Sequence, residues 1–194
     1  MSLRIERKQD TRTAHACTHN LADIPNGVTV STADLVAGGI VAEGSYVGVD
    51  EAGLYHLIKT AKLVENATAS ATEYKVAKGH HFKPGDVITP DAGGKAYTIA
   101  SIDNTSDPTY DKITVGTTLG ASLKAGDALV LAAAEVASKS EFKYAPKAVL
   151  GESYQAAALD NLTAVAVTIG QFKACISPAA PAGLRAALPT VNFI

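Results

Sequence analysis

Residues 82–89 read FKPGDVIT, and residues 123–130 read LKAGDALV. Each copy runs from an apolar residue through Lys and Pro or Ala to Gly-Asp, and then into an apolar strand start. The glycine can take the left-handed conformation of a tight turn, and the aspartate can hydrogen-bond the backbone two residues on. A catalytic aspartate would need an acid, base or metal partner at matched spacing, and no such partner accompanies both copies. The repeat therefore predicts a turn scaffold, made by Gly85, Asp86, Gly126 and Asp127.

Short runs rich in β-branched residues surround this repeat and are separated by turn chemistry at regular spacing. They read TEYKVAK, DVITP, KAYTIASID, DKITVGTTL and DALVLAAAE. Because closing a sheet on itself removes its exposed edges, a series of this kind predicts a small β-barrel, placed at 67–136.

The flanking ranges complete the prediction of an all-β chain. Residues 1–26 are polar and charged at their start and predict an extended N-terminal arm. Frequent glycines in 27–66 disfavour helix and predict strands packing on the core, although LYHLIKTAKLV also fits an amphipathic helix. Residues 137–194 predict returning strands and an apolar tail on the core, with a short helix at 182–188. The expected fold is mainly β, with a small β-barrel or β-tulip-like core, the arm and a short C-terminal helix.

Composition narrows the function classes. The chain has 47% hydrophobic but only 6% aromatic residues and no Trp, which suits a thin β core better than a deep aromatic pocket. A net charge of -2 offers no bulk attraction to nucleic acid or an anionic membrane. No apolar run approaches the roughly 20 residues of a membrane span, and MSLRIERKQD lacks the apolar core of a secretory signal. Two distant cysteines, Cys17 and Cys175, predict no disulfide framework and a reducing compartment.

His15, Cys17 and His19 form an H-x-C-x-H pattern, which on a strand would point three ligands to one face. Structural zinc sites use paired short spacings and a second pair later, and this chain has none, so we expect no metal. A catalytic pairing of Cys17 with a distant histidine lacks any known signature around it. His80 and His81 are adjacent and would face opposite ways on a strand. No P-loop, nucleophile elbow, zincin or dinucleotide motif occurs, so we expect neither an enzyme nor a cofactor.

Oxygen ligands cluster around Pro108 in the pattern D-N-x-x-D-x-x-x-D. The residues are Asp103, Asn104, Asp107 and Asp111. Their spacing is not that of an EF-hand loop and lacks its closing Glu. We therefore expect a long hairpin loop with Asx turns in preference to a calcium site.

Several segments resemble proteins of tailed-phage heads. VAGGIVAEGSYVGVDEAGLYHLIKTAKLVENA resembles the opening of capsid decoration and auxiliary head proteins, and TEYKVAKGHHFKPGDVIT to GASLKAGDALVL is similar to a β-barrel segment of some phage head proteins, including those of Bacteroidetes phages or prophages. The ending, AVTIGQFKACISPAAPAGLRAALPTVNFI, is similar to the closing strand and tail of head decoration proteins. The resemblance covers most of 35–194, as a shared order of short segments.

The resemblance implies a structural virion protein on the capsid exterior, made in the host cytoplasm. Its partner would be the major capsid protein, whose contacts it would stabilise, and such proteins often form homo-oligomers, trimers among them. The charged arm would reach along neighbouring subunits, with Arg4, Arg7, Lys8 and Arg12 as capsid contacts. No nucleic-acid or membrane partner is implied.

Other function classes remain open at this point. A head-fibre base or adhesion module binding host-surface glycan is the main alternative, although sugar platforms usually need exposed aromatic faces, which are scarce in this chain. A nucleic-acid-binding barrel is opposed by the net charge and by the few aromatic residues available for base stacking. A hydrolase built on Cys and His has the least support.

Overall fold

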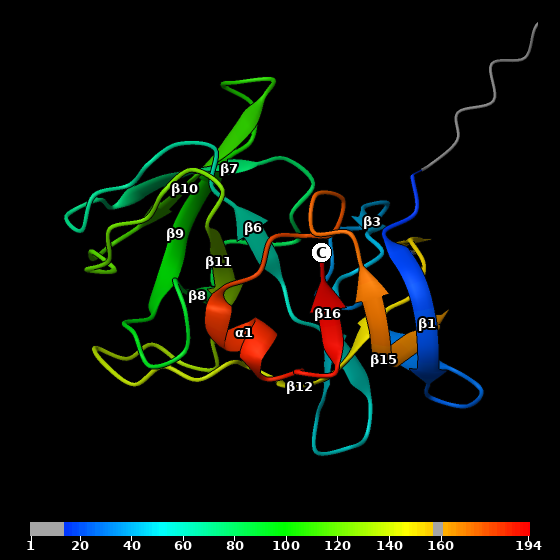
Figure 1. Ribbon diagram of the computed structural model, residues 1–194. Helices are drawn as coiled ribbons and strands as arrows, with labels where there is room; N and C mark the ends of the chain where they lie inside the picture. The colour runs from blue at the N-terminus through cyan, green and yellow to red at the C-terminus, as the bar shows by residue number, and fades with distance from the viewer. Residues whose placement is uncertain (1–13, 157–160) are drawn as a thin grey trace, which may run out of the picture.

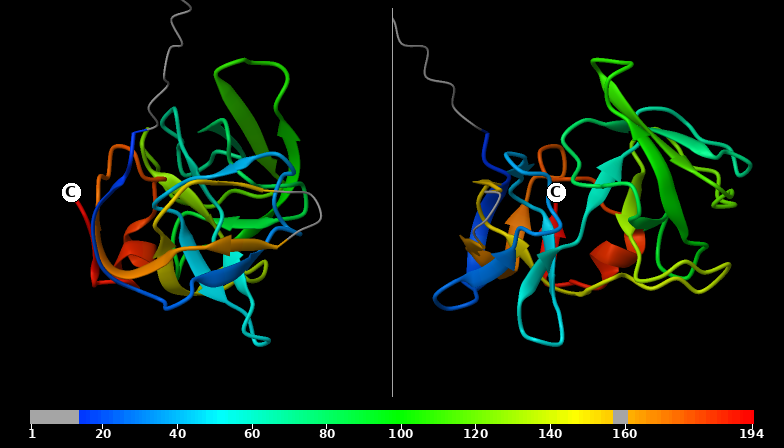
Figure 2. Two further views of the ribbon diagram at one scale, coloured as in Figure 1. Left: turned by 90° about the vertical axis from the view of Figure 1, so that its right-hand side faces the viewer. Right: turned by 180° about the vertical axis from the view of Figure 1, so that it is seen from behind.

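The computed structural model describes residues 14–156 and 161–194, and it is nearly all β, with 43% strand and 3% helix. The all-β prediction is therefore confirmed. Two main sheets lie side by side, and the middle of the chain forms one while both ends of the chain form the other (Figure 1). The view from behind shows the same division (Figure 2).

The large sheet collects strands from both ends of the chain. Within the described residues it has eight strands in the order β1-β15-β12-β4-β5-β2-β14, with β16 paired to β15. Their bounds are β1 (Cys17–Asp23), β2 (Val28–Ser31), β4 (Tyr46–Val49), β5 (Tyr55–Leu57), β12 (Ala145–Leu150), β14 (Leu162–Ala164), β15 (Ala166–Phe172) and β16 (Val191–Phe193). A small separate pairing joins β3 (Ile40–Val41) to β13 (Tyr154–Gln155).

The second sheet, called here the curled sheet, comes from the middle of the chain. In the part of the chain that the structure describes, its six strands run in the order β6-β11-β8-β9-β10-β7. They are β6 (Thr60–Lys62), β7 (Glu73–Ala77), β8 (Val87–Thr89), β9 (Tyr97–Asp103), β10 (Tyr110–Val115) and β11 (Ala128–Leu131). The sheet curls into a half-barrel, and an isolated bridge between Leu63 and Val76 links the β6 end to the β7 end.

Alternating side chains explain the curled sheet. In β10, buried and half-buried residues alternate strictly, as expected when one face meets a core. That core includes Tyr74, Ile88, Ile99, Ile113 and Leu129. Burying side chains of this size is the main favourable contribution to folding, at about 1.5–3 kcal/mol for each large apolar side chain.

The C-terminal segment ties the two sheets together. The short helix α1 (Ala182–Ala186) buries Leu184 in a cluster that also contains Tyr46 of β4 and Val130 of β11. Beyond it, β16 pairs in parallel with β15, and Phe193 stacks on Phe172. The expected C-terminal helix and packed apolar tail are therefore both present.

Two expected boundaries were wrong. The arm placed at 1–26 contains β1, which pairs with β15 and belongs to the large sheet. The sequence did not predict β1 because its residues are mostly polar and carry no apolar stripe, and the strand is held by backbone pairing. The expected barrel range, 67–136, leaves out β6, which pairs with β11. The segment 54–64, LYHLIKTAKLV, which the sequence left open between helix and strand, contains the two strands β5 and β6.

Candidate functional site

The two Gly-Asp turns have matching geometry. Gly85 and Gly126 have φ of 94° and 100°, a region that favours glycine. In each turn the aspartate Oδ2 accepts a hydrogen bond from the backbone N–H of the lysine three residues earlier, at 2.9 Å for Asp86 and 2.8 Å for Asp127. The aspartates do hold the backbone as expected. Each binds the N–H three residues before it, however, and not the expected backbone group two residues after it.

The first turn carries an ion pair, and none is found at the second within the described residues. Lys59 lies just before β6, is only 2% exposed, and places its Nζ 2.8 Å from Oδ2 of Asp86. This contact fixes the first turn to the junction between β5 and β6, which is where the chain crosses from the large sheet to the curled sheet. A buried lysine in an apolar protein needs such a partner, because an unpaired buried charge is very costly.

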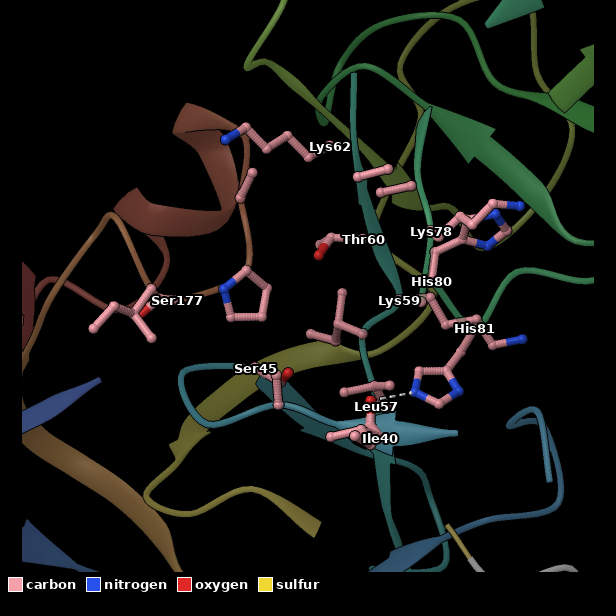
Figure 3. Close-up of a pocket in the computed structure, with 18 of the residues that line it drawn as sticks. Ile40, Ser45, Leu57, Lys59, Thr60, Lys62, Lys78, His80, His81 and Ser177 are labelled. Atoms are coloured by element: carbon pink, nitrogen blue, oxygen red, sulfur yellow. Dashed lines mark hydrogen bonds between the residues drawn. The ribbon is translucent and has the colours of Figure 1, made fainter. Parts of the chain in front are cut away.

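A cavity of about 320 Å³ opens at the same junction, and we call it the inter-sheet cavity. Figure 3 shows Thr60 near the middle of the view, between Ser177 on one side and the two histidines on the other. Its lining includes Ile40, Ser45, Thr60, Lys62, Ile176 and Ser177. A second cavity of about 550 Å³ shares with it the stretch 78–81, so this stretch forms the wall between the two.

His81 is a structural bridge in that wall. Its Nδ1 accepts a hydrogen bond from the backbone N–H of Val36 at 3.3 Å, and its Nε2 donates to the carbonyl of Ile40 at 3.0 Å. Both ring nitrogens thus hydrogen-bond to backbone, one to the loop before β3 and the other to the first residue of β3, with the proton on Nε2. Burial lowers the pKa of His81 below its ordinary value, with Lys59 and Lys83 adding to the effect. The neutral imidazole therefore links the stretch 78–81 to the backbone of Val36 and Ile40.

His80 faces the other way, as expected for adjacent residues, toward Asp111 of β10. Its Nδ1 accepts from the backbone N–H of Phe82 at 3.2 Å, so the neutral ring carries its proton on Nε2. That nitrogen lies 3.3 Å from Oδ2 of Asp111 without the alignment of a hydrogen bond. Lys78 binds the other carboxylate oxygen at 2.7 Å. Burial lowers the pKa of His80, and Asp111 opposes this shift only in part.

His56 and Tyr144 form a third polar group on the large-sheet side. The imidazole stacks on Tyr144 with 4.3 Å between ring centroids, and its Nε2 lies 3.1 Å from Oδ2 of Asp50. Tyr144 donates to Oδ2 of Asp34 at 3.4 Å. Burial raises the pKa of Tyr144 to about 12, with Asp34 adding to the shift. These contacts join the loops after β2 and β4, and strand β5, to the segment before β12.

The H-x-C-x-H residues do not converge. The carboxylate of Glu43 instead anchors the backbone at this point. It accepts hydrogen bonds from the N–H of Ala16 at 2.9 Å and of Cys17 at 2.8 Å. His15 places its Nδ1 3.4 Å from the same carboxylate, while His19 is exposed and lies beyond a register shift in β1. Burial raises the pKa of the Cys17 thiol, and the Glu43 charge adds to it. Both cysteines are free.

The loop between β9 and β10, which carries Asp103 and Asp107, is built from Asx turns, as expected. Asp103 accepts from the backbone N–H groups of Thr105 and Ser106, and the Ser106 hydroxyl lowers the pKa of Asp103 to about 2. Asp107 accepts in the same way from Thr109. Asp111 does not belong to this loop, because it is buried on β10. The alternation of YDKITV gives Asp111 the same parity as Ile113, a signal in the sequence that could have predicted this burial.

The described residues contain neither a metal-binding cluster nor a membrane-spanning helix. In the described residues, no group of three or more His, Cys, Asp or Glu side chains is placed to hold a metal ion, and no helix is long and apolar enough to cross a membrane. Arg4, Arg7, Lys8 and Arg12 lie outside the described residues. Comparisons with protein-family models, with curated proteins and with solved structures gave no match to this chain.

Proposed function

We propose that this chain is a structural virion protein that binds the outer surface of a phage capsid and stabilises contacts between major capsid proteins. Two lines support the proposal. The sequence segments described above resemble capsid decoration proteins, and buried polar groups such as those of Glu43, Lys59 and His81 hold loops and sheets together. The protein acts through its surfaces, without chemistry on a substrate.

The carrying observation is the edge strand β1. Among the described residues it pairs on one side only, with β15, and Leu21 on it is 75% exposed. Ile169 of β15, the register partner of Ala22, is exposed as well. An unpaired edge with exposed apolar side chains is a template for a strand of another chain, and main-chain hydrogen bonds would give such a contact its affinity.

Four basic residues precede β1 in the sequence. They are Arg4, Arg7, Lys8 and Arg12, and the Glu43 carboxylate fixes the point at which β1 begins. A segment tethered beside a docked strand binds at a high effective concentration, so weak individual contacts add up to firm attachment.

Binding to heads tests the proposal. Heads of the encoding phage or prophage, assembled without this chain, are mixed with the purified protein, and occupancy and thermal disruption of the heads are measured. We expect saturable binding and a higher disruption temperature. Leu21→Asp should weaken binding, whereas Ala134→Asp, which adds the same charge at an exposed residue in the loop after β11 and outside both cavities, should not. Absence of binding by the unaltered chain would refute the proposal.

A further inference from the structure

The edge of β6 that faces away from β11 is open only at its start, at Thr60, because β7 covers its end through the Leu63–Val76 bridge and the hydrogen bond from Val64 N to Lys75 O. Hydrogen bonds from Leu131 N to Lys59 O and from Leu63 N to Asp127 O fix the edge that faces β11. Because backbone groups of alternate residues point to opposite edges of a strand, the N–H and C=O of Thr60 point away from β11. Beyond the Leu63–Val76 bridge, no strand covers this edge within the described residues, and Thr60 lines the inter-sheet cavity.

Exposed apolar side chains flank this open edge. Ile40 of β3 is 65% exposed and Ile176 is 38% exposed, and both line the inter-sheet cavity. Val36, also exposed, lines the second cavity behind the histidine wall. Single exposed apolar residues are normal on a protein surface, but several around one concave site next to an unpaired edge mark an interaction surface.

The charge of the cavity selects the partner. Three lysines and two histidines line it, and no Asp or Glu does so among the described residues. Lys59 and Lys78 are neutralised by Asp86 and Asp111, which leaves Lys62 as the lining lysine without an ion pair in the described part of the chain. In Figure 3, Lys62 extends from β6 on the side where Ser177 lies. On a chain of net charge -2, this cavity is a local site for an acidic group.

We propose that the inter-sheet cavity is a docking site for an extended segment of the capsid partner that carries an acidic side chain. The segment lies beside Thr60, at the open start of the β6 edge, with its carboxylate at Lys62 and an apolar side chain between Ile40 and Ile176. This inference rests on the proposed function and gives the chain a second contact besides β1, as bridging two capsid proteins requires. The chain's own residues 1–13 do not fit, since four basic and two acidic side chains give them the wrong charge.

The test compares charge reversals at two exposed lysines. Lys62→Glu should weaken binding to undecorated heads about tenfold, while Lys147→Glu on β12, which makes the same charge change outside both cavities, should leave it unchanged. The difference should shrink at high salt, because the screening length falls to about 3 Å at 1 M. Thermal unfolding of each variant checks that its fold is retained. A photo-crosslinking residue at Ile176 should capture a major-capsid-protein segment that contains Asp or Glu.

The outcomes separate the two proposals. If the unaltered protein binds heads but Lys62→Glu binds as well as Lys147→Glu, the cavity is not a docking site and the proposed function stands. A captured segment without acidic residues would likewise overturn the inference. If the unaltered protein does not bind heads, the proposed function fails, and the inference that rests on it fails too.

Discussion

The ammonium group of Lys59 lies 2.8 Å from the carboxylate of Asp86, and this contact joins the start of β6 to the first Gly-Asp turn. Asp86 Oδ2 also accepts the backbone N–H of Lys83, so one oxygen serves both the turn and the buried lysine. The equivalent Asp127 holds only its own turn among the described residues. Two copies of one sequence pattern therefore differ in their energetic roles, and each copy serves as the control for the other.

Replacing the two aspartates should have unequal effects on stability. Asp86→Ala leaves Lys59 buried without a partner, and we expect it to lower the free energy of unfolding by about 3 kcal/mol. Asp127→Ala removes a turn hydrogen bond alone and should cost about 1 kcal/mol. Urea denaturation measures both values. The double variant Lys59→Met/Asp86→Ala should be more stable than Asp86→Ala, and equal losses at the two aspartates would contradict this account.

The glycines of the two turns are required by their backbone conformation and not by space. An added Cβ at Gly85 or Gly126 meets nothing within 4 Å, but both residues have strongly positive φ. We expect Gly85→Ala and Gly126→Ala each to lower the free energy of unfolding by about 1–2 kcal/mol. Gly116→Ala is the matched control, since its Cβ would also meet nothing and its φ is not positive. Similar melting temperatures for all three variants would argue against backbone strain.

The extent to which sequence predicted this molecule depended on local signals. The Gly-Asp turns, five of the six described strands of the curled sheet and the Asx turns of the loop 103–109 are determined by nearby residues, and the sequence predicted them; it left β6 open between helix and strand. Strand β1 has no apolar alternation, and its place follows from pairing with a segment about 150 residues away. The partners of Lys59 and Glu43 could not be predicted either, because such contacts depend on how distant loops meet.

The neutral histidines of the cavity wall should make the protein less stable in mild acid. The pKa of His81 is lowered in the folded state, so as pH falls through 6.5 the unfolded chain takes up the proton more readily. The contribution of His81 to the free energy of unfolding is therefore fully present above pH 6.5, the ordinary histidine pKa, and is lost as the pH falls below it. His81→Gln should reduce the slope of unfolding free energy against pH in this window. Urea titrations at several pH values measure that slope, and an unchanged slope would show that His81 contributes nothing to it.

Glu43 should control the opening of β1. Its carboxylate accepts two backbone N–H groups, whereas the amide of Glu43→Gln can accept at one oxygen only. We expect the backbone amides of Ala16 and Cys17 to exchange with solvent deuterium about 30-fold faster, which corresponds to about 2 kcal/mol for a hydrogen bond to a charged group. Amides in the curled sheet, such as that of Ile113, serve as the internal control and should keep their protection. Uniform loss of protection would indicate global destabilisation.

Removing the N-terminal segment should separate folding from attachment. Because Glu43 receives the chain at Ala16, deletion of residues 2–14 leaves the described strands intact, and we expect the melting temperature to change little. Binding to undecorated heads should fall at least about tenfold, since a tethered second contact is lost. Replacing the same residues with an uncharged Gly-Ser segment of equal length tests whether Arg4, Arg7, Lys8 and Arg12 act through their charge. Unchanged occupancy after the deletion would show that the segment has no role in attachment and would leave β1 and the inter-sheet cavity as the contacts.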